Sequence, residues 1–163
     1  MITTKQEVYE KLKELGISFS VTEHKPVYTI EEMNELGMEK TENVIKNLFL
    51  RDDKKRNYYL VLLQKDKSIS LKQLREMLGA RPLSFASEED LYLHLGLKKG
   101  SVTPMGILND KEGMVKVIID SEILSFDVIG VHPNENTATI WIQPKDLEKM
   151  LKDNGNEIQR FEF

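Results

Sequence analysis

The segment Val44–Leu50 constrains the fold of this chain more than any other stretch of its sequence. It is an apolar run of β-forming residues that contains one lysine and one asparagine. In a strand, alternate side chains point to opposite faces. The two expected faces are Val44, Lys46, Leu48 and Leu50 on one side, and Ile45, Asn47 and Phe49 on the other. An amine on an apolar face must reach water, a partner or a ligand, because an unpaired buried charge is very costly. Lys46 therefore either extends to the sheet edge or holds an anion or a carbonyl group at the floor of a pocket.

The composition is that of a soluble globular protein. The chain has 163 residues and contains no cysteine, so disulfides, a thiolate nucleophile and a cysteine metal cluster are excluded. No apolar run has the length of a membrane span, and the N-terminus lacks a signal-peptide pattern. We expect one domain over residues 1–163, located in the cytoplasm and not associated with a membrane.

The net charge limits the kinds of nucleic acid that the chain can bind. At −4, the charge argues against binding along a duplex, which needs a continuous basic face. Contact with the end of a nucleic acid through a local patch remains open. The candidate patches are Lys54–Arg56 and Lys98–Lys99, although such short basic runs are more often simply solvated turns.

Helical and strand patterns both occur along the chain, and together they predict an α+β protein. Helical spacing, N-cap residues and glycine stops predict helices over 4–15, 29–37, 70–79, 87–96 and 144–155. Apolar or alternating runs predict strands over 17–21, 44–50, 58–63, 82–86, 114–120, 126–131, 137–142 and 158–163. The strands at 44–50 and 58–63 are expected to form a hairpin. Because the order lacks a regular βαβ alternation, we expect a mixed, curved sheet surrounded by helices.

A second informative stretch is the loop Lys98–Gly106, where glycines and a proline surround small hydroxyl residues. Such a loop can turn backbone N–H groups toward a ligand oxygen, although many surface loops share this pattern. His132, at a strand end beside Pro133, is either a site residue or a structural histidine. His24, His94 and His132 lack the spacing of a zinc site, and no metal or cofactor is expected.

Familiar catalytic motifs are absent from the sequence. There is no Gly-x-Ser-x-Gly elbow, no Walker loop and no dinucleotide fingerprint. A lysine with a pKa of about 10.4 is a poor general base at neutral pH, so Lys46 is more suited to holding a phosphate or a hydroxyl. These residues suit water attack on an activated bond such as an ester, in which each loop donor to the oxyanion contributes about 2.7–4 kcal/mol.

Four motifs in order give the chain a family resemblance. They are Glu23–Thr29, Val44–Leu50, the Gly100–Pro104 loop with its GxxxP pattern, and His132-Pro133 followed by Asn136 and Thr137. Together they resemble the prolyl-tRNA editing family, also described as the YbaK or prolyl-tRNA-synthetase-associated domain. The resemblance covers residues 5–155 and implies that family's α+β fold.

The resemblance implies a trans-editing hydrolase that removes alanine misattached to proline tRNA by substrate-assisted water attack. The expected partners are the acceptor end of tRNA(Pro) and, as a further candidate, prolyl-tRNA synthetase. The resemblance assigns catalytic positions to Lys46 and Gly100, with Lys46 and its neighbour Asn47 near the phosphate and ribose of the terminal adenosine. It also assigns the substrate-binding residues, which are Asn47, Ser101, Val102, Thr103, Pro104, His132, Ile30 and Met33. In this assignment the 100–104 loop holds the aminoacyl carbonyl and amine, His132 shapes the side-chain pocket, and Ile30 and Met33 cover it.

The physical logic of editing agrees with this assignment. A synthetase site made for proline cannot strongly reject alanine, because missing methylenes are worth only ~1–3 kcal/mol. A second, smaller pocket can admit alanine and exclude proline. Two other functions remain open, namely a deacylase of cysteinyl-tRNA(Pro) and a non-catalytic module that binds the 3′ end of a tRNA.

Overall fold

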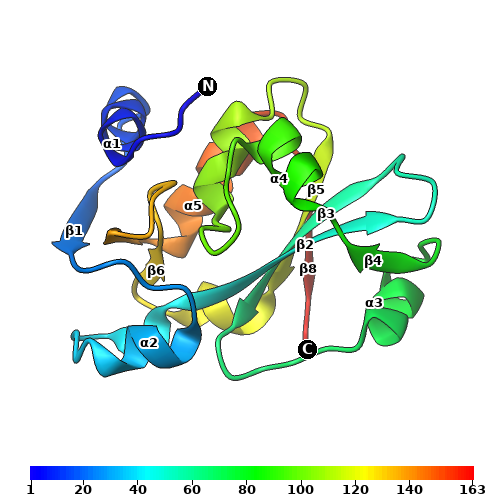
Figure 1. The fold of residues 1–163 in the computed structure, drawn as a ribbon, viewed down its shortest axis with the longest axis horizontal. Helices are drawn as coiled ribbons and strands as arrows, with labels where there is room; N and C mark the ends of the chain where they lie inside the picture. The colour runs from blue at the N-terminus through cyan, green and yellow to red at the C-terminus, as the bar shows by residue number, and fades with distance from the viewer.

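The computed structural model describes residues 1–163 as a layered arrangement of helices and two β-sheets (Figure 1). The helices are α1 (Lys5–Glu14), α2 (Ile30–Glu35), α3 (Leu71–Leu78), α4 (Glu88–Leu95) and α5 (Pro144–Asp153), with short 3₁₀ helices at η1 (Thr41–Asn43), η2 (Pro104–Asn109) and η3 (Ser121–Ser125). The strands are β1 (Phe19–Glu23), β2 (Ile45–Asp52), β3 (Tyr58–Gln64), β4 (Leu83–Phe85), β5 (Val115–Asp120), β6 (Ile129–Val131), β7 (Ala138–Ile142) and β8 (Ile158–Phe161). No helix is long and apolar enough to cross a membrane.

The strands divide into two sheets. The larger has the order β4-β2-β3-β5-β8, antiparallel at β2–β3 and β2–β4 and parallel at β3–β5 and β5–β8. The smaller has the order β1-β7-β6 and is antiparallel. A single isolated bridge between Val44 and Gly130 joins the two. The predicted α+β class, the mixed sheet and the hairpin of β2 and β3 are therefore confirmed, but the strands form two sheets where the sequence suggested one.

Helix ends follow the local sequence signals. The side chains of Thr4, Thr29, Ser70 and Ser87 each accept a hydrogen bond from the backbone N–H three residues later. Such a bond satisfies one of the free donors at a helix start. Gly79 and Gly96 end α3 and α4 in the left-handed conformation. These helices begin and end where the sequence predicts.

Two strands start two or three residues later than predicted. Ile17 donates its N–H to the carbonyl of Leu12 and completes the end of α1, so β1 begins only at Phe19. The strand expected from residue 126 begins at Ile129, because the preceding residues form η3 and Phe126 donates to the carbonyl of Ile123. In both places a backbone N–H group that could have bonded to a neighbouring strand bonds to a helical turn instead.

The two faces of β2 pack against different parts of the core. Ile45 and Phe49 belong to a cluster of 26 buried apolar residues, whereas Leu50 belongs to a separate cluster of 6. The register places Asn47 opposite Leu62 of the large cluster and Lys46 opposite Leu63 of the small one. The face alternation expected for this strand is confirmed, and neighbouring residues of β2 therefore point to different environments.

Candidate functional site

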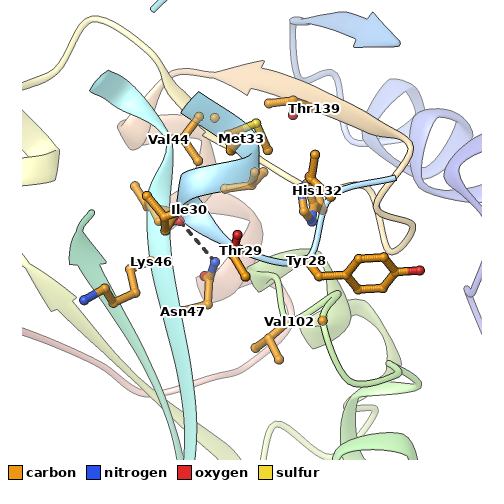
Figure 2. Close-up of a pocket in the computed structure, with 15 residues that line it drawn as sticks. Tyr28, Thr29, Ile30, Met33, Val44, Lys46, Asn47, Val102, His132 and Thr139 are labelled. Carbon is orange, nitrogen blue, oxygen red and sulfur yellow. Dashed lines mark hydrogen bonds between the residues drawn. The ribbon is translucent and has the colours of Figure 1, made fainter. Parts of the chain in front are cut away.

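A small cavity lies at the start of β2, where the two sheets meet. It has a volume of about 200 Å³ and is enclosed by β2, the segment leading into α2, the loop at residues 100–102, the end of β6 and Thr139 of β7 (Figure 2). Sites for drug-sized ligands occupy ~300–1,000 Å³. The cavity is therefore suited to a small chemical group, such as the side chain of an amino acid.

The ammonium of Lys46 points away from this cavity. Lys46 contributes to the cavity lining, but its Nζ donates to the backbone carbonyl of Lys67, and in Figure 2 its side chain lies on the opposite side of the strand from Asn47. The structure thus differs from the expectation of an amine at the pocket floor. In this conformation Lys46 binds a carbonyl group of the protein, a partner that differs from both the sheet edge and a ligand in the pocket, and its catalytic role stays a prediction.

Asn47 presents an unpaired polar atom at the cavity. Its Nδ2 donates to the carbonyl of Ile45 over a long distance of 3.5 Å, the dashed line in Figure 2. Its Oδ1 is buried and has no hydrogen-bond partner in the protein. A buried acceptor without a partner costs about 1–3 kcal/mol. This oxygen is therefore available to accept a hydrogen bond from a bound ligand.

The loop at residues 100–104 closes one side of the cavity. Gly100 has a φ of 86°, and a Cβ atom there would lie 2.7 Å from Cδ1 of Tyr28, so only glycine fits beneath this ring. The N–H groups of Gly100 and Val102 make no hydrogen bond within the protein, whereas that of Ser101 donates to the carbonyl of Lys98. The loop therefore offers two free backbone donors where it meets the cavity.

Thr103 fastens this loop to the strand end that carries His132. Its buried hydroxyl donates to the carbonyl of His132 at 2.5 Å and accepts from the N–H of Met105 at 3.3 Å. The two segments lie 29 residues apart in the sequence. Thr103 thus positions two walls of the cavity relative to each other without lining it.

His132 is a neutral wall of the cavity. Burial lowers the pKa of His132 to about 4, and the nearby ring of His24, whose centroid lies 6.2 Å away, lowers this pKa in the same direction. His24 is held by the carbonyl of Lys25 at 2.8 Å from Nδ1 and by Oγ1 of Thr139 at 2.9 Å from Nε2. Because a carbonyl only accepts, Nδ1 of His24 carries a proton. At neutral pH His132 therefore contributes an uncharged ring.

The short helix α2 covers the cavity from the opposite side. Met33 is buried in a small cluster with Val27, Val44 and Trp141, and Ile30 is half-buried at the helix start. In Figure 2, Ile30 and Met33 lie between the strand that carries Val44 and the segment that carries His132. The predicted position of α2 over the pocket agrees with this arrangement.

Comparisons with known proteins identify the family. The model of the aminoacyl-tRNA editing domain matches residues 24–150. The chain is 47% identical to the prolyl-tRNA editing protein ProX of Acetoanaerobium sticklandii. The alignment covers 98% of this chain and 97% of that protein. The chain belongs to the aminoacyl-tRNA editing domain family. This editing domain is also 36% identical to the prolyl-tRNA synthetase associated domain-containing protein 1 of Danio rerio. That alignment covers 93% of this chain and 83% of the relative.

Solved structures support the fold of this editing domain. A crystal structure of a candidate trans-editing enzyme for prolyl-tRNA synthetase superposes with a TM-score of 0.72, covering 98% of this chain and 96% of that one at 21% identity. A hypothetical protein superposes with a TM-score of 0.71, covering 95% and 97% at 20% identity. The resemblance inferred from the four motifs is therefore confirmed, and aminoacyl-tRNA editing is the broad activity of the family.

The structure brings together most of the site residues that the sequence predicted for this editing domain. Seven of them line the cavity, namely Ile30, Met33, Lys46, Asn47, Gly100, Val102 and His132. Ser101, Thr103 and Pro104 do not line it. The N–H of Ser101 closes a turn, Thr103 faces the carbonyl of His132, and Pro104 is buried at the start of η2.

Several lining residues were not predicted. They are Val27, Tyr28, Thr29, Val44, Ile45, Gly130, Val131 and Thr139. The first three lie in the motif Glu23–Thr29, which carried the family resemblance but gave no reason to assign them to a wall. Gly130 and Thr139 are strand residues, and only the contact between the two sheets brings them to the cavity.

Proposed function

We propose that this protein hydrolyses the ester bond of alanine misattached to proline tRNA, acting in trans on the released aminoacyl-tRNA. The observation that carries the proposal is the cavity of about 200 Å³, in which the unpaired Oδ1 of Asn47 lies near the free N–H groups of the 100–102 loop. The 47% identity to a prolyl-tRNA editing protein supports the choice of proline tRNA.

Backbone donors supply the main electrostatic contribution in this mechanism. The N–H groups of Gly100 and Val102 bind the ester carbonyl and stabilise the oxyanion that forms as water attacks, an effect worth about 2.7–4 kcal/mol per donor in known cases. Asn47 Oδ1 accepts a hydrogen bond from the substrate amine or a ribose hydroxyl. The free hydroxyl of the terminal ribose orients the water, so the proposal requires no protein nucleophile.

Lys46 takes a second position when RNA is bound. Its ammonium leaves the carbonyl of Lys67 and contacts the phosphate of the terminal nucleotide, which a long and flexible lysine side chain can reach by rotation about its own bonds. The carbonyl is a neutral partner, whereas a phosphate forms a stronger charge-assisted hydrogen bond. The resting contact with Lys67 is therefore a competitor that RNA must displace.

Selectivity for alanine comes from the size of the cavity. Met33 and the uncharged ring of His132 line the space for the side chain, and the proposal requires that they admit a methyl group and exclude a pyrrolidine ring. A difference of one methylene corresponds to discrimination of about 10- to 200-fold. We further propose that the protein works in the cytoplasm, where it meets mischarged tRNA(Pro) released by prolyl-tRNA synthetase.

The test compares three esters on one tRNA. We expect the alanyl ester of tRNA(Pro) to be hydrolysed at least about 10-fold faster than the cysteinyl ester, and the prolyl ester to be spared. Faster hydrolysis of the cysteinyl ester would assign the protein to cysteine editing instead. Tight binding of tRNA with no turnover above the buffer rate would show a non-catalytic binding module and reject the enzyme assignment.

A further inference from the structure

A second hollow continues from the cavity along the open edge of β2. It has a volume of about 440 Å³ and shares Asn47, Gly100 and Val102 with the cavity, so the two form one connected groove. Strand β4 pairs only with residues 50–52 of β2. The carbonyl of Phe49 still accepts from the N–H of Ala86, so within this second hollow the edge of β2 has no strand partner only at residues 47 and 48, and it forms the floor of the hollow, which we call the edge groove.

A large aromatic side chain is exposed at the rim of the edge groove. Phe85, the last residue of β4, has 60% of its surface accessible although it belongs to a strand. Leu48, Phe49 and Leu91 add apolar surface inside the same groove. An accessible ring beside an apolar groove is the arrangement on which single-stranded nucleic-acid binding proteins stack bases.

Lys99, which also lines the edge groove, has only a weak partner for its charge. The side chain of Lys99 is 83% exposed, and its one ion pair, with Glu88, is 3.9 Å long. So long and exposed a pair contributes little, which leaves the ammonium available to an external anion. The edge groove therefore combines an aromatic surface with a mobile positive charge, although the protein as a whole has a net charge of −4.

The chemistry of an aminoacyl ester determines what must lie next to the cavity. The amino acid is joined directly to the ribose of a terminal nucleoside, and a cavity of about 200 Å³ that holds the amino acid leaves no room for a purine. The nucleoside must leave through an opening, and the edge groove adjoins the cavity at the free N–H groups that would hold the ester.

We propose that the edge groove binds the terminal nucleobase of the substrate RNA by stacking on Phe85, with Lys99 contacting the phosphate backbone. This inference rests on the proposed function, because it takes an aminoacylated RNA end as the ligand. It adds a subsite in which the base is held independently of the amino acid. Stacking is tolerant of base identity, so this subsite contributes affinity and orientation while the cavity selects the amino acid.

The first experiment measures stacking directly. The terminal adenosine of tRNA(Pro) is replaced by 2-aminopurine riboside carrying an amide-linked, non-hydrolysable alanine, and fluorescence is followed on titration with the protein. We expect quenching with the unchanged protein and with Phe85→Tyr, and loss of most of the quenching with Phe85→Ala. Leu93→Ala is the matched control, since Leu93 is 64% exposed on α4 and lines neither hollow.

The second experiment follows hydrolysis of alanyl-tRNA(Pro) by the same variants. Phe85→Ala should raise KM about 5- to 100-fold and leave kcat within about 2-fold, as expected when an interaction common to ground and transition states is removed. Phe85→Tyr should restore KM, and Leu93→Ala should behave like the unchanged protein. An unaltered KM together with unaltered quenching in Phe85→Ala would overturn the subsite.

The third measurement separates the phosphate contact from the base contact. Lys99→Ala should reduce the slope of log affinity against log salt concentration by about 1, whereas Lys149→Ala on α5 should leave it unchanged. An unchanged slope in Lys99→Ala would remove Lys99 from the subsite. If the unchanged protein hydrolyses no ester, the proposed function fails, and the fluorescence titration still decides whether Phe85 stacks on an RNA base.

Discussion

The polar side chains on the two faces of β2 differ in whether they have hydrogen-bond partners within the protein. On the face of the smaller core cluster, the ammonium of Lys46 donates to the carbonyl of Lys67, and the ammonium of Lys67 in turn pairs with the buried carboxylate of Asp120 at 3.0 Å. On the cavity face, Asn47 keeps a buried oxygen without a partner. Proteins normally satisfy buried polar groups, and under the proposed function the substrate supplies the partner that Asn47 lacks.

Replacing Lys46 is expected to have the largest effect and is the most direct way to break this comparison. If the ammonium moves to the substrate phosphate, Lys46→Ala should lower kcat/KM for alanyl-tRNA(Pro) by about 10³-fold, because truncating a charge pair costs 2–5 kcal/mol. The free energy of unfolding should change by only about 1 kcal/mol, for one hydrogen bond. Full activity with lowered stability would show that Lys46 serves the core alone.

Acid should destabilise the cavity face through His132. The unfolded chain takes up a proton near pH 6.5, whereas the folded chain resists protonation of His132 until its pKa of about 4. The unfolded state therefore binds more protons in this range, and the free energy of unfolding should fall by up to about 3 kcal/mol as the pH drops from 6.5 to 4. No histidine belongs to the smaller cluster on the other face.

Denaturant unfolding at several pH values checks this expectation. His132→Gln cannot take up the proton and should show a flatter dependence of stability on pH, whereas the exchange of a histidine outside the cavity, His94→Gln, should not. An equally steep loss of stability in His132→Gln would mean that other groups cause the acid sensitivity.

Replacing Asn47 sharpens the comparison by separating activity from stability. Asn47→Ala should lower kcat/KM about 10-fold, through loss of one hydrogen bond to the substrate. Its free energy of unfolding should be unchanged or slightly higher, because a buried acceptor without a partner is removed. Thermal unfolding and deacylation assays on one preparation give both numbers, and a clear loss of stability would show that Asn47 is a structural residue.

The smallest expected effect belongs to Thr103, which connects two cavity walls. Thr103→Val leaves the carbonyl of His132 without its hydroxyl donor and should lower the free energy of unfolding by about 1 kcal/mol. Deacylation should fall a few-fold as the loop loses its position. Thr103→Ser keeps the hydroxyl and should restore both quantities, whereas a failure to do so would assign the effect to the lost methyl group.

Local patterns in the sequence predicted the elements better than their contacts. The period of β2 placed Lys46 and Asn47 on opposite faces, and the caps at Thr4, Ser70 and Ser87 located helix starts, because these features depend on neighbours within a few residues. The direction of the Lys46 ammonium depends on a carbonyl 21 residues away. Only the folded chain brings such partners together.

In the candidate site, too, the sequence predicted local motifs better than contacts between distant residues. The motifs identified Gly100 and His132, but the pattern treated residues 100–104 as one binding loop. The structure divides that loop into donors that face the cavity and a hydroxyl, on Thr103, that faces a carbonyl 29 residues away. Tyr28 was missed for a related reason, since its contact with Gly100 joins two loops that no periodic pattern connects.

The single bridge between Val44 and Gly130 has a consequence for how editing specificity can change in evolution. Each sheet supplies part of the cavity wall, and a Cβ atom on Gly130 would lie 3.0 Å from Cγ2 of Val44 across the junction and 2.7 Å from the ring of Trp141 in the same sheet. We expect a larger residue at position 130 to push against Val44 and so change the spacing of the two sheets at the cavity. The width of the cavity could therefore change through Gly130 and Val44 while Asn47 and the 100–102 loop stay the same.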